Sequence, residues 1–261
     1  MIDKRGILHE MEEVAAHAGA LLLGYFRQPL KTRYKGVANL VTEADTASEE
    51  LIIERLKRLH PEAAFLSEEA GGQMIEQGLL WVIDPLDGTT NFAHGFPWFS
   101  VSIALVDGGE PTLGVIYHPI TGELFTGSSG MGAFRNGERI GVSTTQSLRD
   151  SLVTTGFYYH KGEELSRQIA VFDRVHQRVQ TVRRPGSAAL DLAYVAAGYF
   201  DAFWERGLAP WDVAAGYLLV REAGGIVTDY RGCNTGITGS ETIASNGLVH
   251  EMLLRVIAGS S

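Results

Sequence analysis

The order of apolar and polar residues predicts helices and strands that alternate along the chain. Apolar residues recur at helical spacing from Leu8 to Phe26, which predicts an amphipathic first helix. Thr46 and Glu49 have the spacing of a capping box, so a second helix is expected to begin there and to end at His60–Pro61. From Phe99 to Ile140 the pattern changes to alternating strands joined by glycine-containing hairpin turns.

The second half of the chain returns to alternating elements. Helices are expected at 163–180, from 186 with Ser187 as the cap, and from 210, and strands at 153–156, 201–205 and 226–227. This mixture predicts an α/β protein built in layers. Because no internal repeat, low-complexity segment or linker divides the sequence, we expect one domain over residues 1–261, with approximate halves 1–145 and 146–261.

Composition narrows the class of protein. The chain has 261 residues, 45% of them hydrophobic and 20% charged, as is ordinary for a soluble globular protein. Its net charge of -9 argues against a general affinity for nucleic acid or anionic membranes. Cys233 is the only cysteine, which excludes an intramolecular disulfide and predicts a small, half-buried apolar residue. With no signal-peptide core and no apolar run of ~18 residues, we expect a cytoplasmic location.

The strongest chemical signal lies in the stretch Trp81–Phe92. It begins with a nearly unbroken apolar run, the pattern of a strand covered on both faces, and Pro85 should stop that strand soon after Asp84. Asp84 and Asp87 are therefore expected at the strand end, with the carbonyl of Leu86 between them. Two carboxylates and a carbonyl are hard oxygen ligands of the kind that suits Mg²⁺.

The next residues, Gly88, Thr89 and Thr90, offer consecutive backbone N–H groups and a hydroxyl, as at the start of a helix. Such a site stabilises an anion, so an anion site beside a cation site indicates a phosphate held over a metal. The same letters also fit a simple tight turn, because Asp-Gly is a common turn dipeptide. On this stretch alone the two interpretations are equally good.

Further acidic residues occur at the ends of other predicted elements. Asp45 lies at a helix start, Glu68 follows a short apolar segment, and Asp212 lies in the first turn of the helix that begins near Pro210. Taken singly, Asp45 is best explained as a helix cap and Glu68 as part of a solvated loop. If all five acids converge, two charges about 5 Å apart cost about 3 kcal/mol at an effective dielectric near 20. Convergence would therefore imply more than one bound cation.

At this level of detail the chain resembles the inositol monophosphatase family, and most of all its bacterial SuhB-type inositol-1-monophosphatases. The resemblance rests on Glu68–Glu69, Asp84–Phe92 and Trp211–Gly216, with support from Leu40–Asp45 and Arg183–Gly198, which includes Gly186–Ala189. It extends over essentially the whole chain, in the family's order and spacing. It implies an αβαβα sandwich of the inositol monophosphatase and fructose-1,6-bisphosphatase-like sugar phosphatase fold, dependence on two or three Mg²⁺ ions, lithium sensitivity and a homodimer.

The resemblance also implies a role for individual residues. The metal ligands would be Glu68, Asp84, the carbonyl of Leu86, Asp87 and Asp212. The attacking water would be positioned or deprotonated by Glu68, Thr89 and Asp45. The substrate would contact Asp87, Gly88, Thr89, Gly186, Ser187, Ala188 and Glu205, with possible electrostatic help from Lys35.

The function implied is hydrolysis of inositol monophosphate to inositol and phosphate by a metal-activated water, without a covalent intermediate. A sister phosphatase for fructose 1,6-bisphosphate, histidinol phosphate, a nucleotide 3′-phosphate or NADP would share the metal ligands. A third alternative is a regulator of transcription or RNA processing, which the basic stretch Arg174–Arg184 leaves open although the net charge does not support it. Otherwise that stretch is expected to be a solvated face or a subunit contact. No membrane partner is expected.

Overall fold

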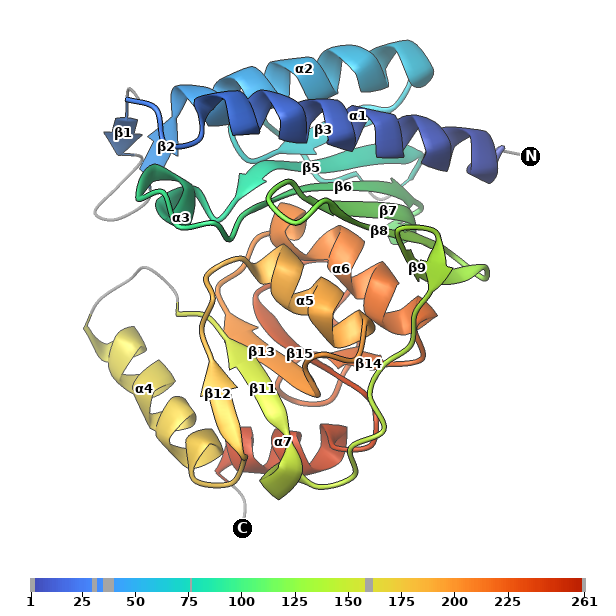
Figure 1. Cartoon of the computed structure of the whole chain (residues 1–261). Coiled ribbons are helices and arrows are strands. Elements are labelled where there is room, and N and C mark those ends of the chain that lie inside the picture. The colour runs from blue at the N-terminus through green and yellow to red at the C-terminus, as the bar shows by residue number, and fades with distance from the viewer. Residues whose placement is uncertain (1–2, 30–31, 35–39, 76, 158–161, 260–261) are drawn as a thin grey trace.

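Two sheets separate three layers of helices, in the order αβαβα (Figure 1). This computed structural model describes residues 3–29, 32–34, 40–75, 77–157 and 162–259. The helices are α1 (Lys4–Tyr25), α2 (Glu43–Leu59), α3 (Thr89–Ala93), α4 (Glu163–His176), α5 (Ala188–Ala196), α6 (Pro210–Glu222) and α7 (His250–Ala258). In Figure 1, α1 and α2 form one outer layer, α5 and α6 the central layer, and α4 and α7 the other outer layer. The layered α/β fold expected from the sequence is confirmed.

The larger sheet has the strand order β10-β9-β8-β7-β6-β5-β3-β4 and is antiparallel except where β3 pairs with β5. Its strands are β3 (Ala64–Ser67), β4 (Gly71–Gly72), β5 (Leu79–Asp87), β6 (Ser100–Asp107), β7 (Glu110–His118), β8 (Glu123–Ser128), β9 (Gly132–Arg135) and β10 (Glu138–Arg139). The smaller sheet has the order β12-β11-β13-β15-β14. Its strands are β11 (Leu152–Thr155), β12 (Thr181–Arg183), β13 (Ala202–Arg206), β14 (Ile226–Thr228) and β15 (Glu241–Ser245). A separate ribbon pairs β1 (Thr32–Tyr34) with β2 (Leu40–Thr42).

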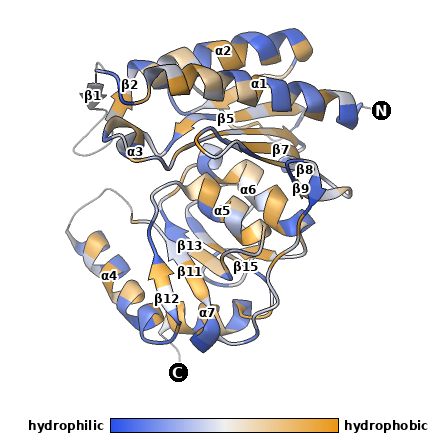
Figure 2. Ribbon diagram, viewed as in Figure 1, coloured by the Kyte–Doolittle hydropathy of each residue, from blue (hydrophilic) through white to orange (hydrophobic). Residues whose placement is uncertain are grey.

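Strand β5 is buried on both faces, as its apolar run predicts. Trp81 and Ile83 pack in the core formed with α1 and α2, whereas Leu80 and Val82 pack in the core formed with α5 and α6. Both sets alternate along one strand because successive side chains point to opposite faces. Figure 2 shows the same arrangement, with apolar residues in the sheets and polar residues on the outer sides of α1 and α2. The strand therefore delivers its last residues to the interface between the outer and central layers.

The start of α2 differs from the sequence-based prediction. The helix begins at Glu43, with Thr42 as its N-cap and Asp45 as the acidic partner of the capping box. The box expected at Thr46 and Glu49 is therefore wrong. The spacing was the same in both cases, but the extended residues 40–42 pair with β1 and so fix the earlier start. Asp45 remains at the helix N-terminus, as expected.

One other expectation is wrong, whereas the expected end of β5 is confirmed. Strand β5 ends at Asp87, soon after Asp84; its pairing with β6 is interrupted between Asp84 and Asp87 and resumes at Asp87 opposite Ser100. Pro85 lies within this interruption, because a residue without an N–H fits where a bulge breaks the ladder. Cys233 is exposed, not half-buried. Among the described residues, no helix is both long and apolar enough to cross a membrane.

The contact between α5 and α6 depends on a glycine. A Cβ added at Gly216 would lie 2.6 Å from Leu192 of α5, well inside van der Waals contact. Gly216→Ala should therefore lower the free energy of unfolding by about 1–3 kcal/mol, because a buried methyl without space forces the two packed helices apart. Denaturant unfolding monitored by circular dichroism measures this change.

Gly24→Ala is the matched control for that substitution. Gly24 lies in α1 with no atom within 4 Å of an added Cβ. Alanine there should raise the free energy of unfolding by about 0.5–1 kcal/mol, since it costs less entropy than glycine in a helix. Equal effects at both positions would contradict the packing explanation.

Candidate metal and substrate site

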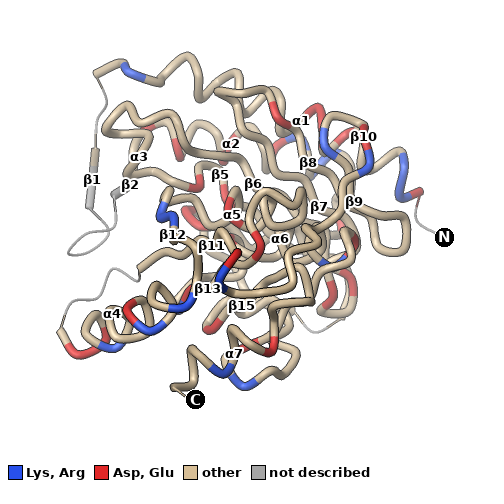
Figure 3. The backbone as a smooth tube through the Cα atoms, turned by 60° about the horizontal axis from the view of Figure 1, so that its bottom comes forward, with Lys and Arg blue, Asp and Glu red and all other residues tan. Residues whose placement is uncertain are grey.

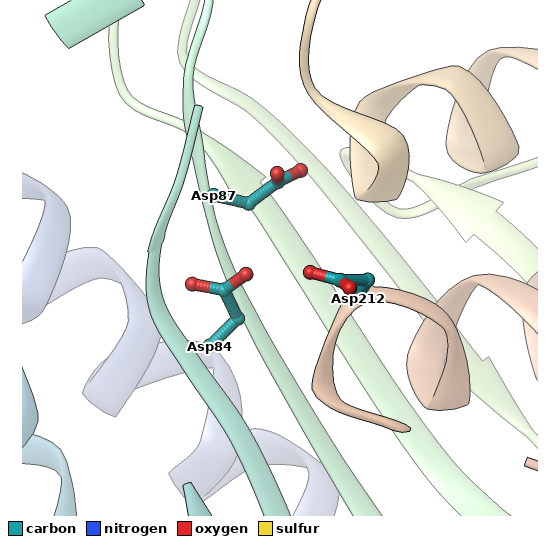
Figure 4. A group of neighbouring side chains, drawn as sticks. All are labelled: Asp84, Asp87 and Asp212. Carbon is teal, nitrogen blue, oxygen red and sulfur yellow. The ribbon is translucent and has the colours of Figure 1, made fainter. Parts of the chain in front are cut away.

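Three carboxylates from two layers meet at the end of β5 (Figure 4). Asp84 and Asp87 come from this strand and Asp212 from the first turn of α6; one oxygen of each lies within 4.8 Å of the others. Backbone N–H groups hold two of the side chains: that of Leu86 donates to Asp84 Oδ1 at 3.0 Å, and that of Ala209 to Asp212 Oδ2 at 2.6 Å. The structure thus brings together residues 128 positions apart in sequence, counted from Asp84 to Asp212.

The electrostatics of this cluster favour protons or cations. Burial raises the pKa of Asp84 well above its ordinary value, and the negative charges of Glu68, Asp87 and Asp212 raise it further. Burial and the charge of Asp87 raise the pKa of Asp212 to about 7. Burial also raises the pKa of Asp87. A divalent cation would offset this desolvation and repulsion, and hard carboxylate oxygens are the donors that Mg²⁺ accepts.

Glu68 lies next to this cluster. It directly follows β3, whose last residue Ser67 pairs with Ile83 of β5, and the backbone N–H of Glu68 donates to the Ile83 carbonyl at 3.3 Å. This pairing places Glu68 beside Asp84, and after burial the charge of Glu68 is the largest cause of the raised Asp84 pKa. The loop interpretation of Glu68 therefore holds for its backbone, but its charge acts on the site.

Asp45 serves both as a cap and as a contact to the site. Its Oδ2 accepts hydrogen bonds from the backbone N–H of Thr42 at 2.7 Å and from the Thr42 hydroxyl at 2.6 Å. Its Oδ1 lies 3.0 Å from the hydroxyl oxygen of Thr89, which is also 3.0 Å from the Leu86 carbonyl. Burial raises the pKa of Asp45 despite these hydrogen bonds. The two explanations considered for Asp45 are thus compatible.

Gly88 forms the turn from β5 into α3. It is the N-cap of α3 and has a φ of 90°, a conformation that L side chains rarely adopt. A Cβ there would lie 3.0 Å from the carbonyl of Trp98 and 3.2 Å from that of Gly186. The turn therefore requires glycine, and it sets Gly88 directly against the start of the segment that leads into α5.

Ser187 joins this segment to the carboxylate cluster. Its hydroxyl donates to Asp87 Oδ2 at 2.5 Å, and the backbone N–H of Ala189 donates to the same oxygen at 2.8 Å. The Ser187 side chain also caps α5 by accepting from the N–H of Leu190 at 3.3 Å, as the sequence predicts. One serine thus fixes both the helix and the carboxylate.

A pocket opens beside the cluster, with an empty volume of about 620 Å³ that includes space open to solvent. It is lined by Asp87, Gly88, Gly156, Phe157, Arg184, Gly186, Ser187, Ala188, Asp191, Glu205, Gly207, Leu208 and Asp212. Glu205 comes from β13 of the smaller sheet, and burial followed by the charges of Asp212 and Asp87 raises its pKa to about 8. Every substrate contact implied by the resemblance lines this pocket except Thr89, whose hydroxyl instead contacts Asp45 and Leu86. Lys35 lies outside the described residues.

Two charged residues of the pocket were not assigned to the site from the sequence. Asp191 is only 1% exposed, and burial followed by the charge of Glu205 raises its pKa well above the ordinary value. Arg184 is solvent-exposed, as expected, but it also lies over the ring of Phe157 at 5.1 Å and lowers the pKa of Glu205. The position of Asp191 one helical turn after Ser187 is the signal that could have revealed it.

Other arginines of the basic stretch have contacts within the protein. Arg174 of α4 donates to the carbonyls of Val256 and Ile257 at the end of α7, at 3.1 and 2.7 Å. Figure 3 shows that α4 carries acidic as well as basic residues along its length. This helix is therefore not a uniformly basic surface.

The fold and the cluster together define a layered α/β protein with a carboxylate site compatible with divalent metal ions. A model of the inositol monophosphatase family matches residues 3–260. The chain belongs to this family, which confirms the resemblance found in its sequence, and the family is known to use metal ions.

Individual relatives agree with this assignment. The inositol-1-monophosphatase of Synechocystis is 44% identical over 251 residues, or 95% of this chain and 87% of the relative. The Nus factor SuhB of Xylella fastidiosa is 42% identical over 258 residues, or 96% of this chain and 94% of the relative. The crystal structure of the extragenic suppressor protein suhB from Bartonella henselae is 42% identical, with a TM-score of 0.92, over 97% of this chain and 98% of that one. The relatives' names thus support a phosphatase and also point to a second kind of role.

The raised carboxyl pKa values predict a pH dependence of stability. In the metal-free protein the free energy of unfolding should fall as pH rises from about 4 to 8, because the folded state holds protons that the unfolded state has lost. Asp212, with a pKa of about 7 against an ordinary value of 3.8, should contribute on the order of 2–4 kcal/mol. Urea unfolding in EDTA across this pH range measures the slope.

Asp212→Asn should reduce that slope, since an amide does not titrate. Asp107→Asn is the control, because Asp107 lies exposed at the end of β6. Stability that is flat or rises between pH 4 and 8 in EDTA would contradict the assignment of the raised pKa values.

Proposed function

We propose that this protein is a Mg²⁺-dependent phosphomonoesterase that hydrolyses inositol monophosphate to inositol and phosphate. The observation that carries the proposal is the convergence of Asp84, Asp87 and Asp212 beside a pocket that Glu205 also lines. A phosphate over the metal ions would leave the sugar alcohol facing the segment 186–188. Membership of the inositol monophosphatase family and the name of the Synechocystis relative support the same substrate.

The residues proposed to hold two or three Mg²⁺ ions are Glu68, Asp84, the Leu86 carbonyl, Asp87 and Asp212. Their donor set fits, since it consists of carboxylate and carbonyl oxygens whose protons compete with a cation near neutral pH. Bound Mg²⁺ would supply a water of lowered pKa and neutralise the charge that develops on the leaving oxygen.

The chain's own groups would orient the reactants. The Thr89 hydroxyl and Asp45 Oδ1, which lie 3.0 Å apart, would position the attacking water, and the raised pKa of Asp45 would make it a better proton acceptor. The N–H groups of Gly88 and Thr89 would bind phosphate oxygens. Glu68 would help to orient the same water.

Phosphate release from a panel of substrates tests the proposal. The panel contains inositol 1-phosphate, fructose 1,6-bisphosphate, histidinol phosphate, a nucleotide 3′-phosphate and NADP, each with Mg²⁺ and with EDTA. We expect Mg²⁺-dependent hydrolysis with the highest kcat/KM for inositol 1-phosphate. Preference for another member would replace the substrate but keep the reaction, and no hydrolysis of any member would contradict the proposal.

Glu205→Gln should separate substrate recognition from hydrolysis. Glu205 lines the pocket, where we expect its carboxyl to contact inositol hydroxyls. Loss of such a contact should lower kcat/KM for inositol 1-phosphate about 10-fold or more and leave hydrolysis of an aryl phosphate within a few-fold of the unaltered protein. Equal losses for both substrates would assign Glu205 a role in folding.

A second, regulatory function is supported by the relatives named Nus factor SuhB, which are 40–42% identical. In this alternative the protein acts in transcription or RNA processing through binding, with or without hydrolysis. Asp87→Asn separates the two functions, since it removes a proposed ligand charge while keeping the side chain's shape. This variant should have no measurable phosphatase activity and an unchanged circular dichroism spectrum. If it restored every phenotype of a deletion strain, the regulatory function would be favoured over the phosphatase.

Lithium inhibition, a homodimer and a cytoplasmic location are proposed from the family alone. Lithium would compete for one of the Mg²⁺ sites. Sedimentation equilibrium distinguishes a dimer from the 28.4 kDa chain.

A further inference from the structure

Three polar side chains of helix α2 contact the segments next to the carboxylate cluster. Ser48 and Glu49 follow Asp45 by three and four positions, so all three lie on the same side of the helix. All three are buried, which is unusual for this chemistry unless the groups are hydrogen-bonded. Asp45 contacts Thr89, and the Ser48 hydroxyl donates to the Pro85 carbonyl at 2.8 Å, within the interruption of β5.

Glu49 has the most extensive set of these contacts. Its side chain is 5% exposed, and a single oxygen, Oε1, accepts from the backbone N–H groups of Glu69 and Ala70, both at 3.0 Å. The same oxygen accepts from the hydroxyl of Ser67. The three donors lie one residue before Glu68 and one and two residues after it. Glu49 therefore fixes the backbone on both sides of that residue.

We propose that Glu49 is a positioning residue for the metal site: it holds the turn at residues 67–70 in the one conformation that aims Glu68 at Asp84. The inference rests on the proposed function, because it assumes that Glu68 is a metal ligand. Hydrogen bonds to a carboxylate are about twice as strong as neutral ones, so three of them can hold a short glycine-flanked turn in place. Removal of groups that orient a metal ligand typically costs 10–100-fold in metal affinity or activity.

The alternative is that Glu49 stabilises the fold without acting on the site. Both roles lower stability when the side chain is removed, so stability does not separate them. They differ in metal binding by the folded protein, because only a positioning role changes the affinity of the site that Glu68 completes.

Glu49→Ala is the test, with Mg²⁺ affinity measured by isothermal titration calorimetry well below the unfolding temperature. We expect the Kd for Mg²⁺ to rise about 10–100-fold and the Mg²⁺ concentration for half-maximal phosphate release to rise in parallel. The ratio of the variant's kcat to that of the unaltered protein should be higher at saturating Mg²⁺ than at low Mg²⁺. Hydrogen exchange of the Glu69 and Ala70 amides should accelerate even in EDTA, since their acceptor is gone.

Three variants serve as controls. Glu49→Gln keeps an oxygen that can accept the same hydrogen bonds, so it should recover most of the lost Mg²⁺ affinity. Glu54→Ala removes a carboxylate from the exposed side of the same helix and should leave the affinity unchanged. Ile52→Val, at a fully buried position of α2, lowers stability without touching the turn and should also leave the affinity unchanged.

The outcomes distinguish failure of the proposed role of Glu49 from failure of the proposed function. If the unaltered protein binds Mg²⁺ and Glu49→Ala binds it equally well, Glu49 is structural and the inference is overturned. The same holds if Ile52→Val weakens binding as much as Glu49→Ala does. If the unaltered protein neither binds Mg²⁺ nor releases phosphate, the proposed function fails, whereas faster exchange at Glu69 and Ala70 in Glu49→Ala would still show that Glu49 holds the turn.

Discussion

The close approach of three carboxylates, two of them buried and the third half-buried, is the constraint on which the rest of this structure depends. Asp84, Asp87 and Asp212 share a site that water does not fully solvate, and each carries a raised pKa as a result. Backbone N–H groups and the Ser187 hydroxyl offset part of the repulsion. The remainder must be met by protons or by cations. A protein that retains such a cluster in its core has a site suited to hard divalent metals.

The site exists only when the layers are assembled. Strand β5 supplies two carboxylates, α6 supplies the third, α5 begins at the serine that binds Asp87, and β13 carries Glu205 across the pocket. The outer helix α2 holds the segment 85–89 through hydrogen bonds of Asp45 and Ser48, and the turn at 67–70 through those of Glu49. Groups from four layers therefore meet at the site, and the spacing between layers sets the distance from the carboxylate cluster to Glu205.

Local patterns in the sequence were sufficient for much of this arrangement. The apolar run before Asp84 predicts the doubly covered strand, Ser187 predicts the start of α5, and Pro210 predicts the start of α6. Similarity to a known family then assigned the acidic residues to one site, which composition and periodicity alone did not do. The positions of acidic residues at the ends of helices and strands identified the candidate ligands, and the family resemblance predicted that they converge on one site.

Several of the features that were missed depend on contacts distant in sequence. The cap of α2 at Thr42 follows from pairing with β1, and the passage of β5 through Pro85 follows from pairing with β6. Glu49 resembled a capping residue because its partners, Ser67 and the amides of 69–70, are 18 to 21 positions away. Such partners are visible only once the layers are in place.

Proton release on metal binding tests the central claim most directly. Calorimetric titration of Mg²⁺ into the metal-free protein, in buffers of different ionisation enthalpy, gives the number of protons displaced at each pH. Mg²⁺ binding should release about one proton or more per chain near pH 6.5 and fewer at pH 8.5. The reason is that cations replace the protons held by carboxyl groups whose pKa is raised. Absence of binding, or binding without proton release at pH 6.5, would contradict the account.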